Sequence, residues 1–156
     1  MYNNMKKSAF LIIFFCYSHS YAQDIEYIKK LDTVYVKFKK SVNQTKQGSA
    51  DYRFYTITLD KIQDEGSLYF TKPDFKDNST ETAKKYSPRI EKKSFLKKHK
   101  NDIVGIDFFQ KYGIKKSTYD AFSVNSVIYI IDCDQRKKDK ISLYRVLMSS
   151  SYRMGE

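Results

Sequence analysis

Apolar and polar residues alternate along several short stretches of the chain, which is the pattern of half-buried β-strands. In residues 33–40, valine and phenylalanine alternate with tyrosine and lysine, so one face is apolar and the other meets water. Residues 52–60 and 67–72 are rich in the aromatic and β-branched side chains that strands favour. A polar loop at residues 41–51 and a shorter turn separate the three segments. We expect them to pair as an antiparallel meander.

Two further strands are predicted near the end of the chain. Residues 127–134 carry apolar side chains on both faces, which is typical of a strand in the centre of a sheet. Residues 141–149 form the last predicted strand, and a charged hairpin loop joins it to the one before. Residues 114–126 are predicted to be a connector leading into this pair.

Helical patterns occupy the remaining segments. Residues 24–31 predict a short helix, because isoleucine and leucine recur there at intervals of three, although an extended lead-in also fits. A second helix is predicted from Pro88 to about Lys100, with Ser87 as its N-cap. Ser94 is an alternative N-cap for this helix.

A third predicted helix is capped by Asn101 or Asp102 and ends at Gly113. A glycine followed by an apolar residue is a common helix terminator, because glycine adopts positive φ without strain. The order of strands, helices and strands predicts an α+β fold, with a mostly antiparallel sheet of about five strands. We expect two or three short helices on one face of that sheet.

The first 22 residues have the three parts of a cleavable secretory signal. Two lysines precede an apolar run of nine residues at 9–17, and Ser20 and Ala22 supply the small residues just before Gln23. A membrane-spanning helix needs about 20 apolar residues, so this run is too short for an anchor. We therefore expect cleavage after Ala22 and export to the periplasm or the cell exterior, with no transmembrane segment in the mature chain.

Cleavage leaves residues 23–156, a length that suits a single small domain with its own core. The full chain has a net charge of +11, and the mature part keeps +9 because the signal contains two lysines and no acid. Cys133 is the one cysteine of the mature chain, so no intramolecular disulfide can form and the core alone must hold the fold.

The basic character comes from 24 lysines against five arginines. Arginine is the residue that reads bases and grips phosphates in a bidentate way, whereas lysine is a hydrated point charge. This balance argues against sequence-specific binding of nucleic acid. Net charge alone speaks to solubility and to non-specific association, so a function has to be sought in local clusters.

The densest cluster is the basic run at residues 84–100, which contains eight cations and one acid. On the predicted helix, most of these cations share one side. Lys92, Lys93, Lys97 and Lys98 are the candidate binding residues. Such a surface suits an acidic protein, a polyanion or an anionic envelope surface, while a merely solvated helix face is the plain alternative.

His99 and Asp102 are the candidate catalytic residues. His99 is the one histidine left after cleavage, and Asp102 follows it closely enough to orient an imidazole base. No nucleophile is marked as their partner in the sequence, so a surface role for His99 is the simpler interpretation.

Asp132 and Asp134 are the candidate metal ligands. On a strand, alternation would place both carboxylates on one face, where they could hold a divalent cation. Acidic pairs of this spacing also arise by chance at strand ends. No pattern in the chain predicts a cofactor.

These observations favour an exported, non-enzymatic binding domain with a lysine-rich surface that faces an anion. The alternative is a small periplasmic hydrolase or metal-dependent enzyme that uses His99 and nearby carboxylates. The partner, the substrate and the oligomeric state are not determined by the sequence.

Overall fold

The computed structural model describes residues 24–48, 53–59, 66–72, 84–125, 127–135 and 138–152. The expected secretory signal at residues 1–22 and its cleavage site lie outside these residues. Within the described ranges, no helix combines the length and apolar character needed to cross a membrane. In chain order the elements are α1 (Ile25–Lys29), β1 (Thr33–Phe38), β2 (Gln44–Gly48), β3 (Arg53–Thr58), β4 (Gly66–Lys72), β5 (Arg89–Lys92), α3 (Ser94–Lys98), β6 (Ile103–Val104), α4 (Ile106–Tyr112), α5 (Ile114–Lys116), β7 (Val127–Asp132) and β8 (Lys140–Tyr152).

Eight strands of the described residues form one sheet in the order β2-β3-β4-β8-β7-β1-β6, and β5 pairs with β8 beside that path. β1 runs parallel to both β6 and β7, whereas the other pairs are antiparallel. The sheet is therefore mixed and larger than expected. The prediction of a mostly antiparallel sheet of about five strands is wrong.

Four segments account for this difference, and one of them is Ile103–Val104, which lies in a predicted helix but pairs with β1 as β6. Part of the expected loop at residues 41–51 forms β2, which pairs with β3 at the sheet edge. Residues Arg89–Lys92, expected to begin a helix, instead pair with β8 as β5. β1 does not pair with β3 or β4 as the predicted meander required, but lies between β6 and β7. This inner position agrees with the burial of Val34 and Tyr35 on opposite faces of the strand.

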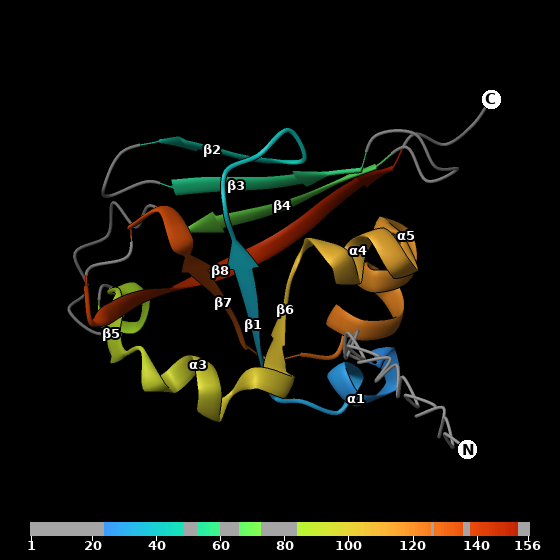
Figure 1. The fold of residues 1–156 in the computed structure, drawn as a ribbon. Coiled ribbons are helices and arrows are strands. Elements are labelled where there is room, and N and C mark those ends of the chain that lie inside the picture. Colours follow the sequence, from blue (N-terminus) through green and yellow to red (C-terminus); the bar gives the residue numbers. More distant parts are fainter. Residues whose placement is uncertain are drawn as a thin grey trace, which may run out of the picture.

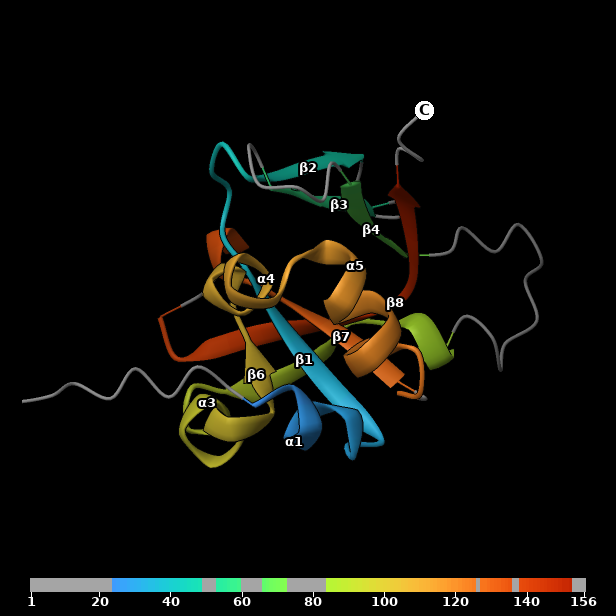
Figure 2. The same cartoon turned by 90° about the vertical axis from the view of Figure 1, so that its right-hand side faces the viewer.

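The strand β8 connects the two parts of the sheet (Figure 1). Residues 140–146 pair with β5 and β7, and residues 147–152 pair with β4. The 13-residue strand is longer than the five or six residues typical of strands, which allows one strand to serve three neighbours. In Figure 2, α4 and α5 lie in front of β1 and β7, with β2, β3 and β4 above them.

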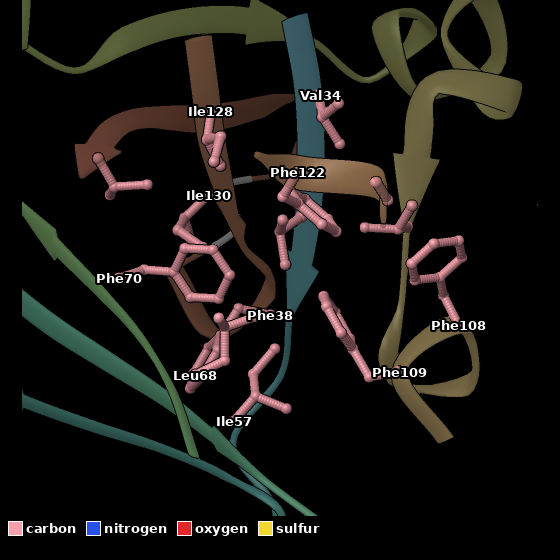
Figure 3. Close-up of a cluster of buried hydrophobic side chains, with 14 of the residues drawn as sticks. Val34, Phe38, Ile57, Leu68, Phe70, Phe108, Phe109, Phe122, Ile128 and Ile130 are labelled. Atoms are coloured by element: carbon pink, nitrogen blue, oxygen red, sulfur yellow. The ribbon is translucent and has the colours of Figure 1, made fainter. Parts of the chain in front are cut away.

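The main core lies between this curved sheet and the helices α1, α4 and α5. Figure 3 shows Phe38, Phe70 and Ile130 of the strands pointing towards Phe109 and Phe122 of the helical side. All five side chains are buried. Aromatic side chains each bury a large apolar area, so they dominate the energetics of such a core.

A smaller core lies on the opposite face of the sheet and attaches α3. Phe95 of α3 is buried there against Tyr35, Ile131, Ile141 and Leu143 of β1, β7 and β8. Helices therefore cover both faces of the sheet, which corrects the expectation that all helices lie on one face. This second core is what positions the basic segment of the chain.

The helix predictions are confirmed in part. α1 follows Asp24, whose side chain caps it, and α4 ends at Gly113. The second helix begins at Ser94 and not at Pro88, and Lys93 occupies the N-cap position that was expected for Ser87 or Ser94. α4 begins only at Ile106, because the residues after Asp102 first pair with β1 as β6.

The expected connector at residues 114–126 is not an irregular loop. It contains α5 and a π-helical turn at Ser117–Phe122. Phe122 fills the main core from this turn. Asn125 holds the turn to α1 by donating to the backbone oxygens of Ile28 and Leu31.

Replacing Gly113 by alanine tests the end of α4. Gly113 has φ 77° and ψ 160°, a conformation that is open essentially to glycine alone. We expect Gly113→Ala to lower the free energy of unfolding by about 2 kcal/mol, measured by urea denaturation. Gln110→Ala, on the exposed side of α4, is the control and should change it by less than about 0.5 kcal/mol. Equal midpoints for both variants would contradict the assigned backbone conformation.

Candidate functional site

The helix α3 presents the basic segment to solvent because one aromatic residue fixes it to the sheet. Phe95 packs edge-to-face on Tyr35 of β1, with ring centroids 5.0 Å apart. With Phe95 directed inward, Lys97 and Lys98 are left exposed on the outer side of the short helix. Figure 1 shows α3 running from β5 towards β6 along the lower edge of the molecule.

A hollow of about 510 Å³ lies on the β5 side of α3. We call it the β5–α3 hollow. Its charged lining consists of Arg89, Lys92, Lys98 and one acid, Glu91, and His99 also borders it. Arg89 Nε donates to Glu91 Oε1 over 2.6 Å, so this acid is already engaged by a cation of the same strand.

A second hollow, of about 570 Å³, lies on the other side of α3. We call it the β1–α4 pocket, because it lies between the end of β1 and the beginning of α4. Lys37, Lys39 and Lys100 supply its cations, and Asp107 is its one acid. The ridge of α3 thus separates two hollows that are both rich in positive charge.

The four predicted binding lysines are all exposed, but they do not form one face of a helix. Lys92 belongs to β5, where it lies opposite Lys140 of β8. Lys93 forms the turn into α3, and Lys97 and Lys98 close the helix. Of the four, Lys92 and Lys98 meet at the β5–α3 hollow. The expected arrangement on one helix is wrong, because strand pairing occupies the first half of the basic run.

His99 and Asp102 are brought together. His99 Nδ1 lies 2.9 Å from Asp102 Oδ2, and both side chains are 24% exposed. The imidazole stacks on Phe95, with centroids 4.3 Å apart, and also contacts Tyr35. A carboxylate on Nδ1 favours the tautomer that carries its proton there, which leaves Nε2 as an acceptor.

A tyrosine from α1 completes this arrangement. The hydroxyl of Tyr27 donates to Asp102 Oδ1 over 2.8 Å, so both carboxylate oxygens are engaged. This hydrogen bond raises the pKa of the Tyr27 phenol, since the neutral phenol is the donor that the carboxylate needs. Tyr27, Asp102 and His99 form a chain that links α1 to the end of α3.

The second candidate pair, Asp132 and Asp134, does not lie on one strand face. β7 ends at Asp132, and Asp134 follows in a one-turn 3-10 helix at Cys133–Gln135. Asp134 is exposed, and its Oδ2 accepts from the backbone N–H of Lys40 over 2.9 Å. Within the described residues, no group of three potential metal-ligating acids, histidines or cysteines is found.

Asp132 is fully buried and its charge is balanced by cations from the β2–β3 hairpin. Lys46 Nζ donates to Asp132 Oδ2 over 2.8 Å, and an Arg53 guanidinium nitrogen lies 3.8 Å from the same oxygen. The Tyr55 hydroxyl donates to it over 3.2 Å. Burial raises the pKa of the Tyr55 phenol well above its ordinary value, and the charge of Asp132 adds to this effect.

The two candidate sites lie on opposite faces of the sheet. Asp132 is on the main-core face, with Tyr55, while His99 packs against the second core on Tyr35. The structure therefore does not combine His99 with the carboxylates of β7 in one site. Sequence reasoning also missed Lys46 and Arg53, because nothing local marks them as partners of an aspartate that lies about 80 residues further along the chain.

Comparisons with protein-family models, with curated proteins and with solved structures find no match to this chain. The chemistry of the surface around α3 and of its two hollows therefore carries the functional argument.

Replacing Asp132 by asparagine tests the buried charge network. Asp132→Asn keeps the shape of the side chain but leaves Lys46 and Arg53 facing a neutral group, so we expect the free energy of unfolding to fall by about 3 kcal/mol. Urea denaturation measures this change. Asp134→Asn removes the same charge from an exposed position and should cost less than about 1 kcal/mol. Similar losses in the two variants would show that burial of Asp132 is unimportant.

Removing the charge of Asp102 tests the chain that ends at Tyr27. In Asp102→Asn, the pKa of Tyr27 should fall towards the ordinary value of about 10, measured by NMR titration of labelled tyrosine with Tyr27→Phe for assignment. In the wild type, the hydrogen bond from Tyr27 to Asp102 stabilises the fold at pH values below the ordinary tyrosine pKa. This contribution is lost as the pH rises through the raised pKa of Tyr27. Asp107→Asn, which removes a charge from α4, should leave Tyr27 unchanged. An equal pKa of Tyr27 in the wild type and in Asp102→Asn would rule out the hydrogen bond.

Proposed function

We propose that the mature chain is an exported, non-enzymatic interaction domain that binds an anionic partner through the surface around α3. The observation that supports this most directly is the pair of hollows flanking α3, each lined by three cationic side chains and a single acid. Lys93 and Lys97 on the intervening ridge extend the same charge. The binding surface is defined here as Lys92, Lys93, Lys97 and Lys98 with the β5–α3 hollow.

Little of this positive charge is balanced from within. Among the ion pairs of the described residues, two involve the lining of the β5–α3 hollow: Arg89 with Glu91, and His99 with Asp102. None of those pairs includes Lys92, Lys93, Lys97 or Lys98. Clustered like charges repel one another by a few tenths of a kcal/mol per close pair, and this cost supports a role for the cluster. An approaching anion relieves this repulsion.

The chemistry favours a partner with several anionic groups. The cations are mostly lysines on both sides of a ridge, so they present a distributed field and not one bidentate clamp. Such a field attracts an acidic protein, a polyanion or an anionic envelope surface and weakens as salt rises. Export would place the domain where such surfaces are exposed.

The contact between His99 and Asp102 supports a second candidate function, a small hydrolase. Asp102 orients the imidazole, and His99 borders a hollow in which Arg89 and Lys98 could stabilise a developing negative charge. Hydrolysis of p-nitrophenyl acetate or phosphate by the mature chain tests it. Activity that is lost in both His99→Gln and Asp102→Asn would favour this function, and a rate equal to that of the buffer would exclude it for these substrates.

Charge reversal tests the proposed binding surface. In the variant with Lys92, Lys93, Lys97 and Lys98 all replaced by Glu, we expect affinity for poly-glutamate and for dextran sulfate to fall by about tenfold or more at 0.1 M salt. The salt dependence of binding should also become shallower, because fewer counterions are displaced. Fluorescence anisotropy with labelled polymers measures both.

A matched variant separates local from total charge. Reversal of Lys29, Lys30, Lys111 and Lys115 makes the same change of charge on exposed positions of α1, α4 and α5 and the residues beside them. This control should lose much less affinity. Equal losses in the two variants would mean that only the net charge matters, and the proposed surface would be wrong.

A further inference from the structure

The β1–α4 pocket has the size and construction of a small-molecule site. Its volume of about 570 Å³ lies within the range of roughly 300–1,000 Å³ that is usual for ligand pockets. Its walls come from the end of β1, the start of β2, α3, β6 and the start of α4. Segments far apart in the chain therefore meet around one hollow beside β6, the edge strand of the sheet.

The floor of the pocket is apolar and firmly held. Leu96 and Ile103 line the pocket and pack against the second core, while Ile106 packs against the main core. The floor of the pocket therefore contacts both the main core and the smaller second core. These side chains are only partly buried, so an apolar ligand would remove further apolar surface from water.

The rim is cationic. Lys37 and Lys39 are two residues apart at the end of β1, so strand geometry directs them to the same side, and Lys100 faces them from the turn after α3. Gln44 holds this part of the chain in place. Its amide donates to the backbone oxygen of Lys37 and accepts from the backbone N–H of Lys39, both over 3.4 Å.

Asp107, the one acid of the rim, places its carboxylate against the backbone of Gly105. Asp107 Oδ1 lies so close to Gly105 that a Cβ there would be only 2.5 Å from it. The absence of a side chain at position 105 therefore lets the single carboxylate fold down at the start of α4. Three ammonium groups against one such carboxylate give the pocket a net positive charge.

We propose that the β1–α4 pocket binds a small amphipathic anion, an alkyl chain with a carboxylate or phosphate head group. The alkyl chain lies on Leu96, Ile103 and Ile106, and the head group lies among Lys37, Lys39 and Lys100. A fully polar anion would leave the apolar floor uncovered, and a neutral apolar molecule would offer no negative charge to Lys37 and Lys39. The charge of this pocket also supports the proposed function, but Lys92, Lys93, Lys97 and Lys98 do not line the pocket, so variants can test the two sites separately.

The test uses matched ligands on the mature chain. Decanoate and decyl phosphate, below their micelle concentrations, distinguish the two head groups, while 1-decanol and inorganic phosphate each supply half of the proposed ligand. By isothermal titration calorimetry, or by displacement of anilinonaphthalene sulfonate, at least one amphiphile should bind about tenfold or more tightly than either half. Binding of 1-decanol as tight as that of the anions, or of neither amphiphile, would overturn the proposal.

Variants locate the site. The double substitution Lys37→Gln and Lys39→Gln should weaken the bound amphiphile about tenfold, and Ser41→Trp, which fills the pocket from an exposed rim position, should weaken it at least as much. Lys29→Gln with Lys30→Gln, at exposed positions that line neither hollow, is the control and should bind normally. Unfolding midpoints confirm that each variant is folded. Undiminished binding by both pocket variants would refute the site, whatever the outcome for the surface around α3.

Discussion

The pairing of β8 with three strands is the constraint on which the rest of the structure depends. Its first half holds β7 and β5, and its second half holds β4, so one strand joins the β2–β4 part of the sheet to the part that contains β1. Successive side chains of β8 pack into the two cores in turn: Tyr144 lies in the main core and Leu143 in the second core. Because β5 leads directly into α3, the same pairing also places the basic segment.

Asp132 supplies a second link between the two parts of the sheet. A buried carboxylate is costly unless it is paired, and here the hairpin β2–β3 provides Lys46 and Arg53 as its partners. The pairing therefore ties the outer hairpin to the end of β7. It also gives Asp132 a structural role, because its negative charge already meets two cations and its oxygens accept from neighbouring donors.

The surface around α3 combines a rigid base with unbalanced charge. Phe95 and Tyr35 fix the helix, so the lysines beside it project from a defined position and not from a loose loop. The linings of the two hollows differ in part. The β5–α3 hollow has a histidine and four charged side chains beside two apolar ones, whereas the β1–α4 pocket has three lysines and one acid around three apolar side chains. We propose a polyanionic partner for the first and an amphipathic anion for the second.

Features that depend on neighbouring residues could be predicted from the sequence: the short helix within residues 24–31, the end of α4 at Gly113, the alternation in β1, and the closeness of His99 to Asp102. Three features follow from the folded arrangement alone: β1 lies parallel between β6 and β7, Arg89–Lys92 is a strand, and Lys37 and Lys39 share a pocket with Lys100. The physical reason is range. Caps and periodicity arise within a few residues, whereas strand partners and buried charge pairs are selected by the packing of segments distant in the chain.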